Sequence, residues 1–319
     1  MNADNAGQEG AVNKPPQRKR GPRPMDWKRR LRYALETPVA YLVYGFFAVL
    51  PVAAASAAGG FILSSIGPRM GASRTARMNI LQAFPEKSEE ERENILRGMW
   101  DNLGRVIAEY PHLRRMESRI EIEGLENLEL IKEKGGIFFS GHISNWEIHG
   151  LMAQRRGLRT HLLYRKPNNP WVDGLLRHAR GGDLVGHITK SDKGAREIFT
   201  LLRRGQAVAI MMDQKLTEGI PMPFFGRDAL TASALAQFAL KFGCPVVPIV
   251  AQRLPGARFR IVISPPLVIT PTGARDADIR HILGDVNRQL EKWIRARPAE
   301  WLWLHKRWAG IGQVSDLNK

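Results

Sequence analysis

Cysteine is nearly absent from this chain of 319 residues, which holds only Cys244, in an apolar context. A single cysteine excludes an intrachain disulfide and a cysteine-rich metal site. We expect it to be a small buried apolar group. Histidine does not supply a zinc motif either, because His142, Glu147 and His149 lack the HExxH spacing in which two histidines lie one helical turn apart. The sequence therefore predicts no metal centre, and we expect no cofactor.

Acidic residues are scarce relative to basic ones. The chain has 31 Asp and Glu against 48 Lys and Arg, which gives a formal net charge of +17. Such an excess implies an anionic partner, which is nucleic acid, phospholipid headgroups, or a phosphorylated or acyl-carrier substrate. Apolar residues make up 44% of the chain, enough for a sizeable core, and the length allows one large domain or two smaller ones.

Residues 1–24 have too little apolar surface to order themselves, and they predict a disordered tail. The end of this tail is basic, with Arg18-Lys-Arg20 and Arg23, and further cations follow at Lys28-Arg-Arg30 and Arg32. An arm that binds nucleic acid is one interpretation. The apolar run that comes next favours a membrane instead.

Charged residues are absent from positions 38–66. This run is longer than the roughly 20 apolar residues that a spanning helix needs. It is also too long, and begins too late, for a cleaved signal peptide. We therefore expect residues 25–70 to contain a membrane-anchoring helix, which Pro51 and Gly59-Gly60 can kink or make re-entrant. Basic residues flank both ends of the run, so counting positive charges gives no firm orientation.

Residues 71–319 are expected to form the catalytic domain, with alternating helices and strands. Positions 72–115 are helical with a break at Phe84-Pro85, and Ser88-Glu-Glu-Glu91 has the spacing of a capping box. The alternation predicts an α/β fold, with a central mixed sheet flanked by helices. The expected strands are 136–140, 160–164, 207–212, 246–250 and 259–263, and the expected helices are 144–155, 171–180, 193–204, one capped by Thr231 that reaches Phe242, and 277–295.

His142 and Glu147 follow the expected strand 136–140 across a Ser-Gly turn. Histidine can exchange a proton near neutral pH, and a nearby carboxylate can fix its tautomer and stabilise the imidazolium. If residues 140–144 form a strand-to-helix turn, both side chains can converge at the mouth of the sheet. The alternative is a core histidine beside a surface glutamate.

Two further candidates, Arg165 and Asp213, follow other predicted strands, where open α/β folds place their sites. Arg165 is a planar cation suited to phosphate, carboxylate or an oxyanion, or else it is a solvated surface arginine. Asp213 ends an apolar strand, which is a weak signal by itself. The end of the chain, residues 298–308, mixes three tryptophans with basic residues. It suits a lipid headgroup boundary, stacking on nucleic-acid bases, or packing under the sheet.

Taken together, these motifs resemble the bacterial lipid A biosynthesis acyltransferases, a family of late lauroyl and myristoyl transferases. The similarity lies in the order and spacing of Asn79-Ile-Leu-Gln-Ala-Phe-Pro85, Gly141-His-Ile-Ser-Asn-Trp-Glu147, Tyr164-Arg-Lys-Pro-Asn-Asn-Pro170, Met212-Asp-Gln214, Pro223-Phe-Phe-Gly226 and residues 298–308. The family is similar to the glycerolipid acyltransferases in its His-x4-acid motif, here with Glu147 as the acid. The Phe-Pro-Glu-Gly-Thr-type phosphate block of glycerol-phosphate acyltransferases is missing from this sequence.

The resemblance implies a glycerolipid-acyltransferase-like fold and transfer of an acyl chain from acyl-carrier protein to a phosphorylated lipid A precursor. The acceptor would be a hydroxyl, typically that of a 3-hydroxyacyl chain. It implies that His142 is the general base and that Glu147 orients it, while Arg165 and Asp213 bind substrate or the oxyanion. The expected location is the cytoplasmic face of a bacterial inner membrane, with anionic lipids as further partners and no nucleic acid. Two alternatives stay open: another acceptor, such as a phosphatidylinositol mannoside or a lysophospholipid, or a membrane-tethered nucleic-acid-binding protein.

Overall fold

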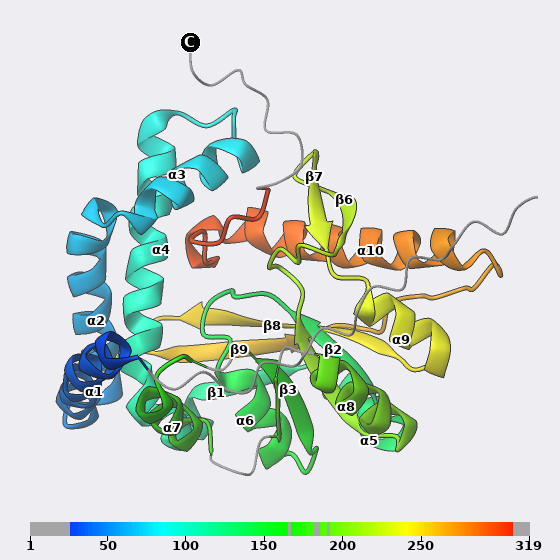
Figure 1. Ribbon diagram of the computed structural model, residues 1–319, viewed down its shortest axis with the longest axis horizontal. Coiled ribbons are helices and arrows are strands. Elements are labelled where there is room, and N and C mark those ends of the chain that lie inside the picture. Colours follow the sequence, from blue (N-terminus) through cyan, green and yellow to red (C-terminus); the bar gives the residue numbers. More distant parts are fainter. Residues whose placement is uncertain (1–25, 165–166, 182–185, 190–191, 309–319) are drawn as a thin grey trace, which may run out of the picture.

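A seven-stranded mixed sheet lies at the centre of the computed structural model, which describes residues 26–164, 167–181, 186–189 and 192–308 (Figure 1). The strand order is β1-β9-β8-β2-β5-β3-β4, and only β8 and β9 pair antiparallel. The predicted mixed α/β sheet is thus confirmed. The strands are β1 (Ile120–Glu123), β2 (Gly136–Ser140), β3 (Thr160–Tyr164), β4 (Gly186–Thr189), β5 (Ala207–Met211), β8 (Val246–Leu254) and β9 (Arg258–Ile263).

Helices cover both faces of this sheet, so the central strand β2 is buried on both sides. Side chains alternate along a strand, so Ile137 and Phe139 pack into the core formed with α8 (Asp192–Arg203), α9 (Ala234–Phe242) and α10 (Arg275–Ala296). Phe138 points the other way, into the core formed with α5 (Leu125–Lys134) and α6 (Ile148–Arg155). The site therefore rests on a strand that is fixed from two sides.

Four helices precede the sheet in the chain: α1 (Trp27–Ala48), α2 (Val52–Ile66), α3 (Ala72–Ala83) and α4 (Glu89–Glu109). Helix α2 packs closely along α4, since a Cβ added to Gly59 would lie 2.4 Å from the carbonyl oxygen of Gly104. The predicted capping box at the start of α4 is confirmed. Ser88 Oγ accepts from the backbone N–H of Glu91, and the Glu91 carboxylate accepts from the backbone N–H of Ser88.

The predicted membrane-anchoring helix is not supported. The charge-free run 38–66 is divided between α1 and α2, with Pro51 as the residue that precedes α2. Proline has no backbone N–H and restricts the residue before it, so it separates the two helices. Along the described ranges, no helix is both long and apolar enough to cross a membrane.

The structure changes several of the predicted element boundaries. The helix expected from 144 begins at Ile148, because Ser144 has φ 57° and turns the chain out of a helical path. Strand β8 runs on past 250 to Leu254. Thr231 ends a strand rather than capping a helix, since α9 begins at Ala234.

A hairpin that the sequence did not predict packs against the carboxyl-terminal segment 298–308. It pairs β6 (Ile220–Phe224) with β7 (Arg227–Thr231) around the turn residues Phe225 and Gly226, whose φ angles are 53° and 70°. Two positive φ values suit a tight hairpin turn. The prolines in β6 made it resemble a loop. Three tryptophans of the carboxyl-terminal segment are buried, and two of them pack against Phe224, so the packing interpretation of that segment is the one found.

Three of the predictions made from the sequence are not tested by the described residues. The basic tail 1–24 and Arg165 lie outside the described residues, and the division of the chain at residue 70 stays a prediction.

Cys244 is half-buried between α9 and β8, and burial raises the pKa of its thiol to about 11. A thiol that resists ionisation makes a poor nucleophile.

Candidate active site

The segment after β2, residues 142–144, is hydrogen-bonded to residues 300–302 near the carboxyl terminus. Ile143 forms an isolated antiparallel bridge with Trp301. On either side of it, the carbonyl oxygen of His142 accepts from the N–H of Leu302 at 3.0 Å, and Ser144 donates its N–H to the carbonyl of Glu300 at 2.9 Å. These backbone bonds fix residues 142–144 beyond the carboxyl end of β2. His142 therefore sits on a rigid support rather than on a free loop.

His142 is paired with Asp213. Its ring Nδ1 lies 2.8 Å from Asp213 Oδ1, and its backbone N–H donates to Oδ2 at 2.8 Å. Strand register accounts for the meeting: β2 and β5 are parallel neighbours with Ser140 beside Met211, so the residues two positions beyond each strand end face each other. Trp301 Nε1 donates to the same Oδ2 at 2.8 Å. The two oxygens of Asp213 thus hold both the ring and the backbone of one histidine.

Asp213 is ionised at neutral pH although it is buried. Burial by itself raises the pKa of Asp213, but the adjacent His142 ring, the His142 N–H and Trp301 together lower it to about 2. A carboxylate at Nδ1 favours the tautomer with its proton on that nitrogen and leaves a lone pair on Nε2. The His142 side chain is 19% exposed, and Gln214 Nε2 lies 3.3 Å from its Nε2. This arrangement can accept a proton from a group that approaches Nε2.

Glu147 is bound to a different set of partners. Its carboxylate accepts hydrogen bonds from the Tyr110 hydroxyl at 2.6 Å and from Trp146 Nε1 at 3.0 Å, and it forms a two-pronged ion pair with Arg180 at 2.5 and 2.8 Å. Burial raises the pKa of Glu147, but Arg180 and these hydrogen bonds reverse that effect and lower it. The carboxylate that bonds the His142 ring is therefore that of Asp213, and the catalytic assignment of Glu147 stays a prediction.

A second buried carboxylate, Glu109 at the end of α4, supports the same loop. It accepts from Ser56 Oγ at 2.7 Å and from Asn145 Nδ2 at 2.8 Å, and it pairs with Arg253 of β8. Arg253 Nε also donates to Asn102 Oδ1 at 3.0 Å, and Asn102 in turn donates to the carbonyl oxygens of Ser144 in the loop and of Glu300. Buried ionic groups are retained only when they are paired and hydrogen-bonded in this way. Sequence patterns did not predict this network, because its members are far apart along the chain.

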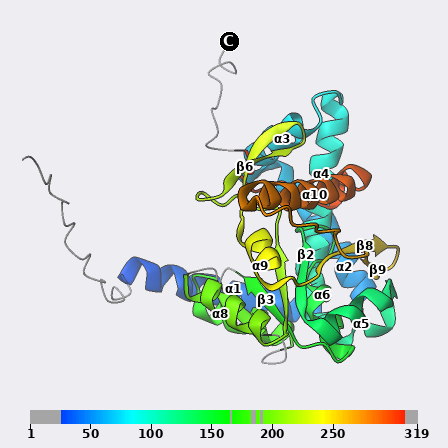
Figure 2. The same cartoon turned by 90° about the vertical axis from the view of Figure 1, so that its right-hand side faces the viewer.

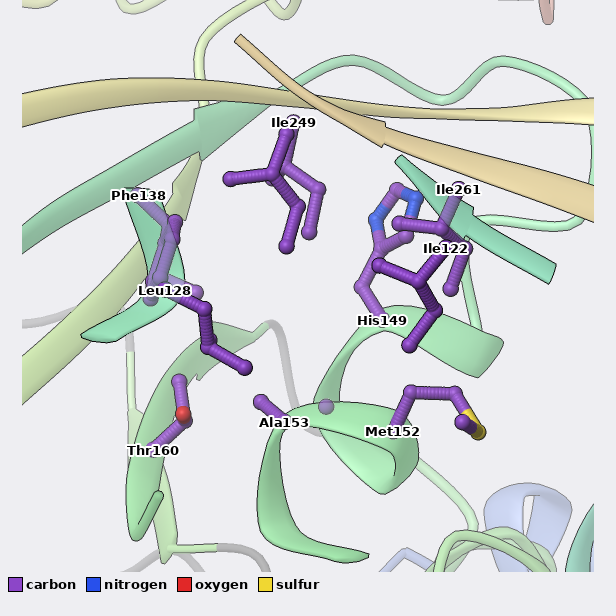
Figure 3. Close-up of a pocket in the computed structure, with 12 residues that line it drawn as sticks. Ile122, Leu128, Phe138, His149, Met152, Ala153, Thr160, Ile249 and Ile261 are labelled. Carbon is purple, nitrogen blue, oxygen red and sulfur yellow. The ribbon is translucent and has the colours of Figure 1, made fainter. Parts of the chain in front are cut away.

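An apolar cavity lies between the sheet and helices α5 and α6 (Figure 3). Its volume of about 20 Å³ has room for one water and not for an acyl chain. The imidazole of His149 points into it, and Nε2 has no hydrogen-bond partner in the described part of the chain. Burial lowers the pKa of His149 to about 4, although Glu147 opposes this. His149 is therefore neutral in the folded protein at pH 7.

Replacing His149 by leucine is expected to weaken the loss of stability below pH 6.5. The His149 pKa is 6.5 in the unfolded chain and about 4 in the folded one, so the unfolded state binds the extra proton between these values. The free energy of unfolding then falls as pH falls through this window, by about 3 kcal/mol in all, and is unaffected by this group above it. Urea unfolding at pH 7 and pH 4.5 measures the difference. The exposed His178→Leu serves as the control, and equal pH slopes for wild type and His149→Leu would contradict the assignment.

Comparisons with known proteins bear on what this site does. The family described as bacterial lipid A biosynthesis acyltransferase matches residues 26–309 of the chain. A lipid A biosynthesis lauroyltransferase of Escherichia coli (strain K12) is 26% identical over 243 residues, covering 72% of this chain and 76% of that protein. A palmitoleoyltransferase of the same strain is 25% identical and covers 77% and 84%, and a myristoyltransferase is 24% identical and covers 76% and 78%. Among the described residues, no group of three His, Cys, Asp or Glu side chains is placed to hold a metal ion.

Proposed function

The chain belongs to the bacterial lipid A biosynthesis acyltransferase family, and from this premise we propose that it moves a fatty acyl chain from acyl-carrier protein to a hydroxyl of a lipid A precursor. The family makes the chain an acyltransferase. Donor, acceptor hydroxyl and catalytic base belong to the proposal. The observation that carries it is the His142–Asp213 pair, which is a general base with its orienting carboxylate at the edge of the sheet.

In the proposed reaction, His142 Nε2 takes the proton of the acceptor hydroxyl while the oxygen attacks the thioester carbonyl. Asp213 accepts the Nδ1–H bond throughout and stabilises the imidazolium that forms. The tetrahedral intermediate collapses by breaking the carbon–sulfur bond. The departing thiolate takes the proton back from His142, so the products are an ester and the free thiol of the carrier. No covalent protein intermediate is needed.

Other groups are proposed to assist this step. Arg165 stabilises the oxyanion or binds a phosphate of the precursor, as its planar cationic group allows. Glu147 fixes the loop that carries His142, because it ties this loop to Tyr110 and Arg180. The net charge of +17 favours encounters with two anionic partners, the phosphorylated lipid and the acidic acyl-carrier protein. We propose the cytoplasmic face of the inner membrane as the location, because an amphiphilic acceptor and a cytosolic donor would meet there.

The rival interpretations receive less support. Acceptors such as a phosphatidylinositol mannoside or a lysophospholipid suit the same chemistry, but the three relatives are all named for lipid A biosynthesis. A nucleic-acid-binding role would use the tryptophans near the carboxyl terminus for base stacking. Trp301, Trp303 and Trp308 are at most 5% exposed, which leaves them no face for a base.

Mass spectrometry of lipid A tests the proposal most directly. Lipid A from cells that lack the gene is expected to be lighter by one acyl chain, and a plasmid copy of the gene should restore the mass. The same extracts are analysed for phospholipids as a control for another acceptor. Unchanged lipid A in the deletion strain, or a change confined to phospholipids, would overturn the assignment of the acceptor.

A further inference from the structure

We propose that Gln214 is a further catalytic residue, whose side-chain amide donates a hydrogen bond to the negative oxygen of the tetrahedral intermediate. This role rests on the proposed function, because that oxygen forms only when a thioester carbonyl is attacked beside His142. Gln214 directly follows Asp213 in the chain. Three observations support it: where the backbone holds the residue, which nitrogen its amide faces, and which neighbouring donors are already bonded.

The backbone holds Gln214 just beyond the carboxyl end of β5. Met212 donates its N–H to the carbonyl oxygen of Ser140 at 2.9 Å, which extends the pairing of β5 with β2 one residue past the end of β5. The next side chain, Asp213, is buried and accepts hydrogen bonds through both of its oxygens. Gln214 therefore follows two fixed residues, and its position relative to the histidine is set by the sheet.

Gln214 also stands where the chain leaves the sheet. Residues 214–219 lead from β5 to the hairpin of β6 and β7, and α10 lies between the sheet and this hairpin (Figures 1 and 2). The Leu290 side chain of α10 lies so close to Gly141 that an added Cβ would be 3.1 Å from its Cδ2. The α10 side of this edge is thus filled, whereas Gln214 is only half-buried. A substrate that reaches His142 Nε2 meets the Gln214 amide as well, because 3.3 Å separates the two nitrogens.

The ionised carboxylate on the other side of the ring determines which end of the amide faces His142. Asp213 can only accept, so Nδ1 carries the ring proton and Nε2 of the neutral ring has a lone pair. The amide nitrogen of Gln214 therefore donates toward that lone pair. At 3.3 Å this contact is longer than most hydrogen bonds in proteins, and an acceptor hydroxyl can replace it.

Three other N–H groups around His142 are already bonded to carboxylates. The backbone N–H of His142 and Trp301 Nε1 both donate to Asp213 at 2.8 Å. Trp146, whose ring lies edge-on to the imidazole with centroids 5.2 Å apart, donates its Nε1 to a different carboxylate at 3.0 Å. Of these four described donors, the amide of Gln214 is the one directed at Nε2, beside which the new ester bond forms.

Arrival of the acceptor hydroxyl at Nε2 releases the amide for the thioester carbonyl. The hydroxyl oxygen gives its proton to His142 and bonds to the carbonyl carbon, while the π electron pair moves to the carbonyl oxygen. The Gln214 NH₂ group, displaced from Nε2, donates to this oxygen, which is one bond away from the attacked carbon. Collapse returns the pair, breaks the carbon–sulfur bond and passes the proton from His142 to the departing thiolate. One such donor contributes about 10²–10³-fold to kcat.

Steady-state kinetics of Gln214→Met test the donor, because methionine keeps the length of the side chain and has no N–H group. With acyl-carrier protein thioester and lipid A precursor, kcat is expected to fall about 10²–10³-fold while both KM values change little, since the bond is made in the transition state. Gln289→Met is the matched control: Gln289 is also half-buried, but it lies outside the buried face of α10 and should keep wild-type kcat. A raised KM with wild-type kcat would show ground-state binding and overturn the assignment.

Two further readouts do not respond to a merely structural role. In Gln214→Glu a carboxylate faces Nε2 and stabilises the imidazolium, so the acid limb of the pH–rate profile should move to higher pH than in Gln214→Met. A phosphonate analogue, with a P–O⁻ group where the oxyanion forms, should bind Gln214→Met more weakly by about the same factor as the fall in kcat/KM. An unmoved limb in Gln214→Glu, or unchanged phosphonate affinity in Gln214→Met, would overturn the proposal.

Failure of this role and failure of the proposed function give different results. Transfer by the wild type that Gln214→Met does not impair overturns the role of Gln214 alone. No transfer by the wild type overturns the proposed function and this role with it. Both variants are expected to keep the wild-type Tm, because the Gln214 side chain is only half-buried, so the loss of kcat is measured on folded protein.

Discussion

Replacing His142 by alanine is expected to lower kcat for acyl transfer by about 10²–10⁴-fold, the usual contribution of a general base. The reason is geometric: the Nδ1 side of the ring is held by Asp213, and Nε2 remains as the nitrogen that can take the acceptor proton. Purified protein, acyl-carrier protein thioester and lipid A precursor give kcat and KM directly. KM is expected to change little, because the base acts on the transition state.

A second variant at this position separates catalysis from folding. His142→Asn keeps an N–H donor close to where Nδ1 stands, so the bond to Asp213 can survive, but it offers no base. Both variants should show this loss of kcat, and the asparagine variant should have the higher Tm. The exposed His178→Ala is the matched histidine control. Wild-type kcat in either His142 variant would rule out the proposed base.

The sequence indicated His142 as a candidate base but did not indicate that Asp213 is the carboxylate bonded to its ring. Residues 136–140 read as a strand because they are apolar and bounded by turns, and the structure confirms that strand. Asp213 was also placed after a strand. What the sequence did not contain was the order of the strands: only when β5 lies beside β2, with Ser140 next to Met211, do His142 and Asp213 meet.

Glu147 was expected near His142 because it follows five positions later. A single residue, Ser144 at φ 57°, changes the path of the chain and sends that carboxylate toward Tyr110 and Arg180. Serine carries no signal for a left-handed conformation, which glycine or asparagine would have suggested. Local propensity therefore cannot predict this turn, because backbone hydrogen bonds to Glu300 and Leu302 impose it.

The apolar run 38–66 shows a different limit of the sequence. Counting apolar residues predicts a long helix, whereas the observed break depends on Pro51 and on the packing of Gly59 against Gly104. The apolar character of the run agrees with the structure, since both α1 and α2 expose apolar side chains. Their arrangement depends on contacts with α4, some 45 residues later in the chain, that no local window includes.

Replacing Asp213 by asparagine is expected to lower kcat by about 10²–10⁴-fold while leaving the fold intact. The amide removes the charge that stabilises the imidazolium. Its NH₂ group must face either the His142 ring at Nδ1 or the two donors at the other oxygen, the His142 backbone N–H and Trp301 Nε1. If the amide turns its NH₂ group toward Nδ1, the imidazole adopts the wrong tautomer. Because the imidazolium has lost its counter-charge, the acid limb of the pH–rate profile should move to lower pH.

The matched control is Glu147→Gln, the same carboxylate-to-amide change in a neighbouring buried site. It removes the charge of the carboxylate that pairs with Arg180 in this buried site, so the free energy of unfolding should fall by up to about 3–5 kcal/mol. Its kcat can fall with the displaced loop, but the acid limb of the pH–rate profile should stay in place, because Glu147 bonds Tyr110, Trp146 and Arg180. A shifted limb in Glu147→Gln together with an unshifted limb in Asp213→Asn would reverse the assignment. The two profiles therefore decide which carboxylate serves His142 during the reaction.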